Sequence, residues 1–212
     1  MLKLLCLILA LLLLPCAALA EATDPIVYTH PVHGYSFIMP ADWTIIDSAT
    51  FDSVLEAAGN GEIPGITSDF VSQYATQIQT QEMMIAVSAD GMNNLNSIAS
   101  DLGYGFSLEE VVSMICPNVV SQYNTQFAGC DIDDTGSVVT VGERDFARLT
   151  LSYAPFDGIT LRLHQYIVMD NTIMYCLTFT NTALGEALSQ EEMEALYAPI
   201  LESLVLPGEA DA

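Results

Sequence analysis

The sequence predicts an α+β fold in which an antiparallel β-sheet carries helices on both faces. Residues 138–180 contain three strand-like segments separated by tight turns, and both faces of the resulting sheet would be rich in apolar side chains. Helical segments with clear capping signals lie on either side of this meander in the sequence. An apolar sheet face must be covered, so we expect an α/β/α sandwich.

The first twenty residues have the pattern of a cleaved signal peptide. Lys3 provides the positive charge, residues 4–14 form an apolar run, and Ala18-Leu19-Ala20 is a small-x-small cleavage site. The apolar run is shorter than the roughly 20 residues that span a bilayer. We therefore expect cleavage near Ala20 and a secreted or cell-envelope location. Lipidation of Cys16 is an alternative, which the proline directly before it disfavours.

The rest of the chain is the size of one domain. After cleavage about 190 residues remain, which is ordinary for a single domain with its own core. We divide the chain into a signal peptide over 1–20, a short leader over 21–27, a single domain over 28–206 and a frayed tail over 207–212.

The mature chain is strongly acidic. Lys3 is the only lysine and leaves with the signal peptide, so three arginines remain against 27 acidic side chains, a formal side-chain charge of 3 − 27 = −24. Such a surface repels nucleic-acid phosphates and anionic lipids, so we expect neither nucleic acid nor a membrane surface as a partner. It favours cations, basic peptides or simple solubility.

The N-terminal part of the domain predicts a hairpin followed by helices. Residues 28–47 predict two strands around the turn at residues 39–42, and Phe37 and Trp43 should anchor this hairpin to the core. The segments that follow are predicted as helices over 51–59 and 67–78, a strand over 83–87, and a weaker strand or loop over 93–99.

Two helices begin with capping boxes. Ser107 has a glutamate three residues later, and so does Ser189; in each pair the two side chains can cap the first turn. The first helix should kink or restart at Pro117 and end near residues 127–129. The second should kink at Pro199. Its apolar stripe comprises Met193, Leu196, Tyr197, Ile200, Leu201 and Leu204.

The meander is predicted from its turns. Asp157-Gly158 is a two-residue hairpin signal and Asp170-Asn171 marks the next turn, so two tight turns set the register. The first predicted face carries Leu149, Leu151, Tyr153, Arg162, His164, Tyr166, Val168, Ile173, Tyr175, Leu177 and Phe179. The second carries Thr150, Ser152, Leu161, Leu163, Gln165, Ile167, Met174, Cys176, Thr178 and Thr180.

Several short motifs resemble one known family. Residues 35–43 resemble the aromatic-x-Phe-x-x-Pro-x-x-Trp opening of the PsbP-like and DcrB-like proteins, which share the Mog/PsbP-type α/β/α sandwich. Residues 142–150 resemble the family's glycine-then-strand start of the meander, and residues 174–180 and 200–204 resemble its closing strand and helix. The resemblance covers most of residues 28–206, although the two helical segments between Phe51 and Ile78 are longer than in the compact version.

This resemblance implies a function without catalysis. The family's members are mainly non-enzymatic: photosystem accessory subunits, envelope proteins and a nuclear import factor. The shared motifs are structural, so the resemblance implies no catalytic residues and no cofactor for this chain.

The histidines and cysteines give few candidates for chemistry. His30 and His33 lie in a turn, where they could share a metal only with a third ligand, and His164 is expected to be a hydrogen-bonded core residue. A nucleophilic pair of His164 and Cys176 is disfavoured because the two residues are predicted on opposite faces. Cys116 and Cys130 are the closest cysteines in the mature chain; a disulfide between them and three free thiols are both open.

The acidic segment 131–136 is the best candidate ligand site. We expect a loop here in which Asp131, Asp133 and Asp134 could bind calcium, because acidic residues at positions one and three and a glycine at position six are typical of the start of a calcium loop. The acid needed at position twelve is missing, since Gly142 stands there. Calcium is therefore the only cofactor that the sequence suggests.

Three functions remain. The first is an exported, non-catalytic accessory or binding protein of the cell envelope or extracellular space, with an unknown protein or envelope partner. The second is a calcium-responsive structural or sensing protein that uses the acidic segment. The third is a hydrolase of unrecognised type, for which paired carboxylates such as Glu109 and Glu110 are the only candidate catalytic groups. Adjacent residues of a helix do not face each other, so this pair is poorly placed to act on one substrate. The first function is the one we expect, and it is not an enzyme.

Overall fold

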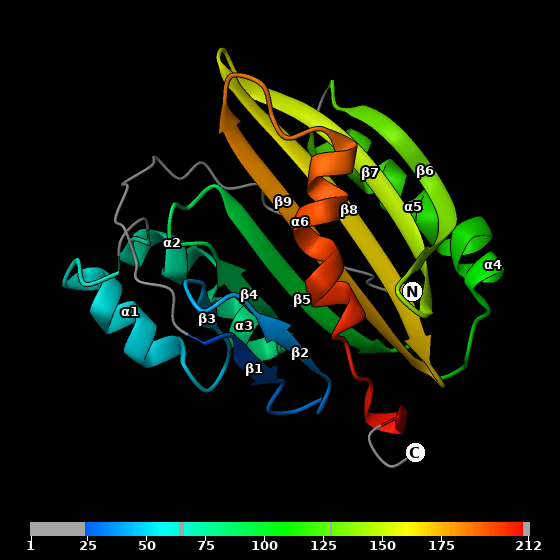
Figure 1. Ribbon diagram of the computed structural model, residues 1–212, viewed down its shortest axis with the longest axis horizontal. Helices are drawn as coiled ribbons and strands as arrows, with labels where there is room; N and C mark the ends of the chain where they lie inside the picture. The colour runs from blue at the N-terminus through cyan, green and yellow to red at the C-terminus, as the bar shows by residue number, and fades with distance from the viewer. Residues whose placement is uncertain (1–23, 64–65, 128, 210–212) are drawn as a thin grey trace.

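A seven-stranded antiparallel sheet forms the centre of the molecule. The computed structural model describes residues 24–63, 66–127 and 129–209. The sheet order is β3-β4-β5-β9-β8-β7-β6, and β1 and β2 form a separate two-stranded sheet (Figure 1). The strands are β1 (Ile26–Thr29), β2 (Ser36–Met39), β3 (Thr44–Ile46), β4 (Met84–Val87), β5 (Asn93–Asp101), β6 (Asp131–Val141), β7 (Arg144–Phe156), β8 (Ile159–Asp170) and β9 (Ile173–Leu184).

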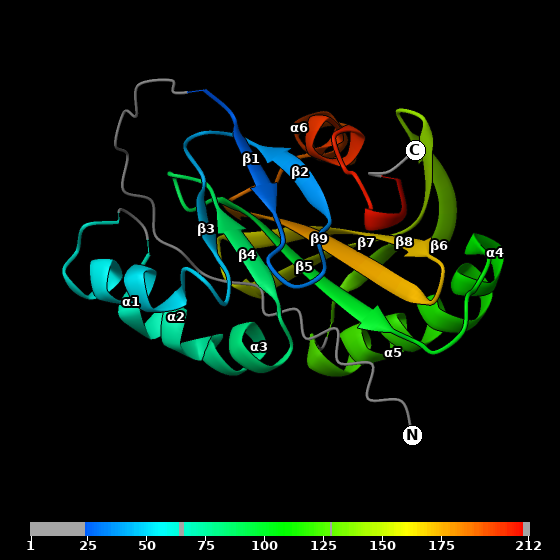
Figure 2. The ribbon, with the colours of Figure 1, turned by 90° about the horizontal axis from the view of Figure 1, so that it is seen from below.

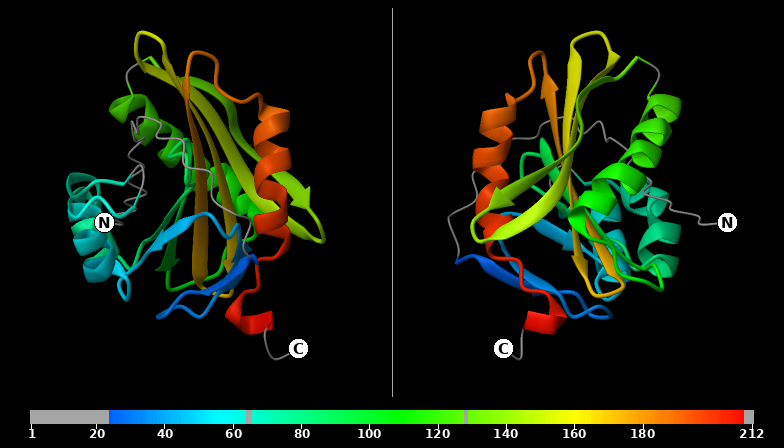
Figure 3. Two further views of the ribbon diagram at one scale, coloured as in Figure 1. Left: turned by 60° about the vertical axis from the view of Figure 1, so that its left-hand side comes forward. Right: turned by 90° about the vertical axis from the view of Figure 1, so that its right-hand side faces the viewer.

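Helices cover both faces of this sheet, as predicted. The helix α6 and the small sheet β1-β2 lie on one face, and the remaining α-helices lie on the other (Figures 2 and 3). The helices are α1 (Phe51–Gly59), α2 (Ser68–Gln73), α3 (Ala75–Thr80), α4 (Leu108–Glu110), a π-helical turn (Val111–Ile115), α5 (Cys116–Gln126), α6 (Gln190–Glu202) and a 3-10 turn, η2 (Pro207–Glu209). No helix in the described ranges is long and apolar enough to cross a membrane.

The predicted first hairpin is wrong. β2 pairs with β1 instead of with β3, and β3 joins the large sheet at its edge by pairing with β4. The turn between β1 and β2 is closed by the His30 amide, which donates to the carbonyl of Tyr35 at 2.8 Å. Phe37 and Trp43 are nevertheless both buried in the core beneath α6, as expected.

A β-bulge changes the predicted faces of the meander. Phe156 pairs with Ile159 across the tight turn, but by Tyr153 the register has shifted by one residue. β7 is therefore turned over relative to the prediction, because a one-residue shift exchanges the two faces. The predicted arrangement of β8 against β9 is correct, since Asp170 pairs with Ile173. Leu149, Leu151 and Tyr153 consequently belong with the α5 face.

The helix boundaries follow the capping and proline signals closely. Both predicted capping boxes are present, at Ser107 and at Ser189. The predicted helix over 67–78 is divided at Tyr74 into α2 and α3. The interruption expected at Pro117 takes the form of a π-helical turn that ends at Ile115, directly before α5 begins. The segment predicted as a weak strand or loop is β5, an interior strand of the sheet that pairs with β4 and β9.

Candidate functional site

A cleft between α6 and the strands β6 and β7 is the best candidate site. Its volume is about 560 Å³. Three glutamates from α6 stand around one arginine and one tyrosine of the sheet, and small apolar side chains complete the walls. The lining residues are Val139, Thr140, Val141, Gly142, Arg148, Tyr166, Glu191, Glu194, Ala195, Ala198, Leu201 and Glu202.

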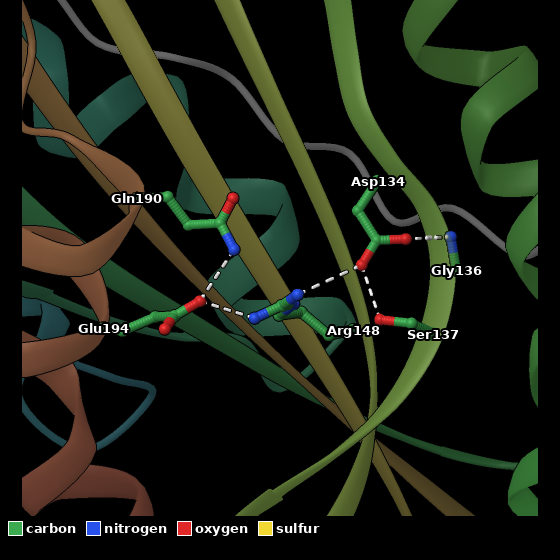
Figure 4. Close-up of polar contacts among 6 residues, drawn as sticks. All are labelled: Asp134, Gly136, Ser137, Arg148, Gln190 and Glu194. Carbon is green, nitrogen blue, oxygen red and sulfur yellow. Dashed lines mark hydrogen bonds and ion pairs between the residues drawn. The ribbon is translucent and has the colours of Figure 1, made fainter.

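Arg148 ties the two sides of the cleft together. Its guanidinium donates from Nη1 to Glu194 of α6 and from Nη2 to Asp134 of β6, at 3.3 Å (Figure 4). Gln190 supports this contact by donating to the same Glu194 oxygen at 2.9 Å. One half-buried cation thus holds carboxylates from two elements that are distant in the sequence. Charge-assisted hydrogen bonds of this kind are stronger than neutral ones, so the contact should fix α6 against the strands.

The ionisation of this site follows from its contacts. Burial acts to raise the pKa of Asp134, but hydrogen bonds from Ser137, Gly136 and Arg148 outweigh it and lower the pKa below its ordinary value. Burial raises the pKa of Tyr166 to about 12, although Arg148 beside it acts in the opposite direction. At neutral pH Asp134, which contacts Arg148 beside the cleft, is therefore ionised, and Tyr166 inside the cleft is protonated.

A glycine allows the turn between β6 and β7 to lie close to the C-terminal end of α6, at one end of the cleft. Gly142 lies in the turn between β6 and β7 with a φ of +62°, which favours glycine. A Cβ atom there would also lie 2.9 Å from Cγ of Glu202 at the end of α6. A larger residue at this position would displace Glu202.

The acidic segment 131–136 is part of β6 and not the loop that we predicted. Strand alternation leaves Asp131 and Asp133 exposed, while Asp134 is half-buried and held by Arg148. The structure therefore does not bring the three carboxylates together around one point. Among the described residues there is no group of three or more histidine, cysteine, aspartate or glutamate side chains arranged to hold a metal ion. Calcium binding itself stays untested by the structure, and the extended conformation of the segment argues against it.

His30 has a structural role. It is buried, its Nε2 lies 2.8 Å from the carbonyl oxygen of Glu82, and its Nδ1 accepts hydrogen bonds from the amides of Val32 and His33. Both ring nitrogens are thus occupied by the backbone. The His33 ring pairs with the Glu82 carboxylate at 2.8 Å, at a second cleft of about 630 Å³.

His164 differs from the prediction in one respect. It is fully buried, as expected, but neither ring nitrogen has a hydrogen-bond partner in the described part of the chain. Its position in β8 places it on the α6 face, whereas Cys176 belongs to the α5 face. The two side chains therefore do not form a nucleophile–base pair.

Cys116, Cys130 and Cys176 form no disulfide with one another. Cys116 and Cys176 are buried and Cys130 is partly exposed, so the possible disulfide between Cys116 and Cys130 is absent. Burial, with smaller contributions from Cys176 and Asp134, raises the pKa of Cys116 to about 11. A thiol with such a pKa is protonated at neutral pH and is a weak nucleophile.

Glu109 and Glu110, the carboxylates considered for a hydrolase, lie in the first turn of α4. Glu110 accepts a hydrogen bond from the Ser107 amide at 2.8 Å and so completes the capping box of α4. Glu109 lies beside it on the exposed first turn of the same helix.

The role of Arg148 was not predicted from the sequence, in which this residue stands only within the motif at the start of the meander. A usable signal was present: the chain has three arginines and one lysine against 27 acidic side chains, so each arginine is expected to attract carboxylates. Which carboxylates meet it depends on the position of α6, which the sequence did not reveal.

Comparisons with known proteins identify the fold. No family model and no curated protein matches the chain. Among solved structures it is similar to cyanobacterial PsbP (CyanoP) from Synechocystis sp. PCC 6803, with 12% identity, a TM-score of 0.50, and coverage of 90% of this chain and 96% of that chain. The fold is PsbP-like. This confirms the fold that the motifs suggested, and at such low identity the likeness shows the fold alone.

Two further solved structures are similar to this chain. A protein from Bacteroides thetaiotaomicron has 14% identity and a TM-score of 0.45; the alignment covers 89% of this chain but only 51% of that longer one. LpqN, which is involved in cell envelope biogenesis of Mycobacterium tuberculosis, has 13% identity and a TM-score of 0.38, with coverage of 86% and 90%.

Proposed function

We propose that this protein is an exported, non-catalytic accessory or binding protein whose α6 cleft takes a basic segment of a partner in the cell envelope or extracellular space. The observation that carries the proposal is the cleft itself. Glu191 and Glu202 are exposed at its margin, and Glu194 reaches inside to Arg148. With Arg148 already shared by Glu194 and Asp134, the remaining charge of the cleft is negative.

The walls of the cleft suit an aliphatic side chain with a charged end. Ala195, Ala198 and Leu201 offer an apolar surface on α6, and Val139 and Val141 offer one on β6. Lysine and arginine side chains bury their methylene groups along such surfaces while the charged end stays near acidic groups and water. The excess of acidic side chains over the whole mature chain would also speed the approach of a basic partner.

The absence of catalysis and the export are part of the same proposal. Cys116 is buried and protonated at neutral pH, and His164 and Cys176 point to opposite faces of the sheet. The N-terminal pattern supports export. The envelope role of LpqN and the PsbP-like fold agree with an accessory function.

A direct binding assay tests the cleft. The probe is a fluorescent ten-residue peptide of alternating lysine and alanine, titrated with the protein at low ionic strength and followed by fluorescence polarisation. The double variant Glu191→Gln with Glu202→Gln should weaken binding about fivefold, since each exposed charge contact contributes up to about 1 kcal/mol.

A matched control removes the same charge from the opposite face. Glu56 of α1 and Glu109 of α4 are exposed, and both helices lie across the sheet from α6. Glu56→Gln with Glu109→Gln should leave the affinity near that of the wild type. Equal losses in the two double variants would mean that the peptide senses only the net charge, and the proposed cleft would be wrong.

A further inference from the structure

A block of hydrogen-bond donors without acceptors lies on the sheet face that α6 covers. It is formed by Arg148 and Thr150 of β7 and by Arg162 and His164 of β8. Within the described part of the chain, no hydrogen-bond partner is present for Nε of either arginine, for the Thr150 hydroxyl or for either ring nitrogen of His164. All five atoms are buried, and Thr150 and His164 are 2% and 0% exposed as whole residues.

Strand register brings these side chains together. Thr150 is the direct cross-strand partner of His164, and the neighbouring pairs are Arg148 with Tyr166 and Ser152 with Arg162. Residues two apart on a strand share a face, so all four side chains project toward α6. Arg148 is a diagonal neighbour of His164, and Arg162 is a diagonal neighbour of Thr150, so the two arginines lie on opposite sides of the Thr150–His164 pair. Direct and diagonal cross-strand neighbours lie about 5 to 8 Å apart at their Cα and Cβ atoms, close enough for Thr150, His164 and Arg162 to meet one ligand.

The electrostatics of His164 agree with this placement. Burial, together with the charges of Arg148 and Arg162, lowers the pKa of His164 to about 4. Both guanidinium groups thus lie near the imidazole, which is neutral at pH 7. A neutral imidazole donates one hydrogen bond, so the block offers four donors: two Nε–H groups, one ring N–H group and one hydroxyl.

The two arginines differ in their ion pairs. Arg148 is shared by Asp134 and Glu194, whereas Arg162 forms no ion pair with any described residue. This is unexpected in a chain with 27 acidic side chains. A buried donor without an acceptor costs about 1 to 3 kcal/mol, and more when it is charged. The acceptor that these donors need is therefore best sought outside the chain.

We propose that this block binds a small monoanion of halide size beneath α6. An anion beside the Thr150–His164 pair can accept hydrogen bonds from Thr150, His164 and Arg162 at once, whereas a single water molecule accepts only two. The positive charge of Arg162 supplies the attraction that a neutral ligand would lack. The proposed site adjoins the peptide cleft, because Arg148 belongs to both, but the proposal does not depend on the function proposed above.

Anomalous diffraction would locate the anion directly. Crystals of the protein without its predicted signal peptide are soaked in sodium bromide, and data are collected at the bromine absorption edge. We expect an anomalous peak within hydrogen-bonding distance of Arg162 Nε and the His164 ring. Peaks on the outer surface alone, or water density at the block, would overturn the proposal.

Thermal unfolding tests the same site in solution. Melting temperature is measured against sodium bromide, with sodium gluconate replacing it at constant ionic strength so that screening is held fixed. A saturable rise is expected for the wild type. Arg162→Met should weaken the apparent affinity at least about tenfold, as loss of a charged hydrogen bond predicts. Thr150→Val, which keeps the shape of the side chain, should weaken it less.

Arg144→Met is the matched control. Arg144 belongs to the same strand face but lies four residues before Arg148, away from the Thr150–His164 pair. Its Nη2 is paired with Glu209 of η2, while its Nη1 has no hydrogen-bond partner among the described residues. This variant should keep the full bromide response. An unchanged response in both Arg162→Met and Thr150→Val would contradict the site. A response to acetate but not to bromide would also contradict it, because the ligand would then be a carboxylate.

Discussion

At the scale of single residues, His164 should control part of the pH dependence of stability. Its pKa is about 4 in the folded protein, below the ordinary 6.5. Between these values the unfolded chain binds a proton that the folded chain does not, so the free energy of unfolding falls as the pH drops. The contribution is full above pH 6.5, and its loss by pH 4 amounts to about 3 kcal/mol.

Urea unfolding at pH 4.5 and pH 7 measures this effect. The wild type should lose more stability than His164→Gln over that interval, because the other titrating groups are common to both proteins. Both are compared in gluconate buffer, which keeps halides out. Parallel losses in the two proteins would show that His164 does not titrate as its burial requires.

Trp43 is the second residue with a clear expectation. It is 7% exposed and packs edge-on against Tyr197 of α6, with ring centroids 6.4 Å apart. Trp43→Ala should lower the free energy of unfolding by about 3–5 kcal/mol, the usual result of removing a large buried aromatic ring. Tyr104→Ala removes an aromatic side chain that is 58% exposed and should change it by less than about 0.5 kcal/mol. Chemical denaturation of both variants measures these two changes in the free energy of unfolding.

At the scale of elements, one proline explains the error in the predicted meander. The turn at Asp157-Gly158 was identified correctly, yet β7 lies with its faces exchanged. Pro155 stands inside the irregular stretch between Tyr153 and Phe156. Proline has no amide hydrogen to donate to the ladder, so regular pairing is interrupted there. That residue was a readable signal for a bulge, and with it the correct face of Arg148 could have been predicted.

The strand β6 gives a definite expectation for calcium. Asp134 is engaged by Arg148, and Asp131 and Asp133 project from an extended strand instead of a curled loop. Calcium needs six to eight oxygen ligands around one point. We therefore expect no saturable heat when calcium chloride is titrated into the protein in a calorimeter. A saturable signal that disappears in Asp131→Ala with Asp133→Ala would restore the calcium site.

At the scale of the whole molecule, local sequence signals predicted the helices, the strands and their layered arrangement. They did not predict which strands lie at the edge of the sheet or where α6 packs on it. Capping boxes, prolines and strand periodicity identified most helices and strands, because these signals act within a few residues. The placement of β3 at the sheet edge and of α6 over β7 depends on long-range packing. Arg148 and Glu194 meet across 46 positions of the chain, so the cleft exists only in the assembled fold.

The position of β6 has one more consequence. This eleven-residue strand is an outer edge of the sheet, and its free backbone groups could pair with a strand of another molecule. Two register irregularities disturb that edge, around Asp134, and exposed aspartates charge it. Such features discourage edge-to-edge aggregation. The acidic residues that first suggested a ligand thus help to keep neighbouring copies of the protein from joining their sheets.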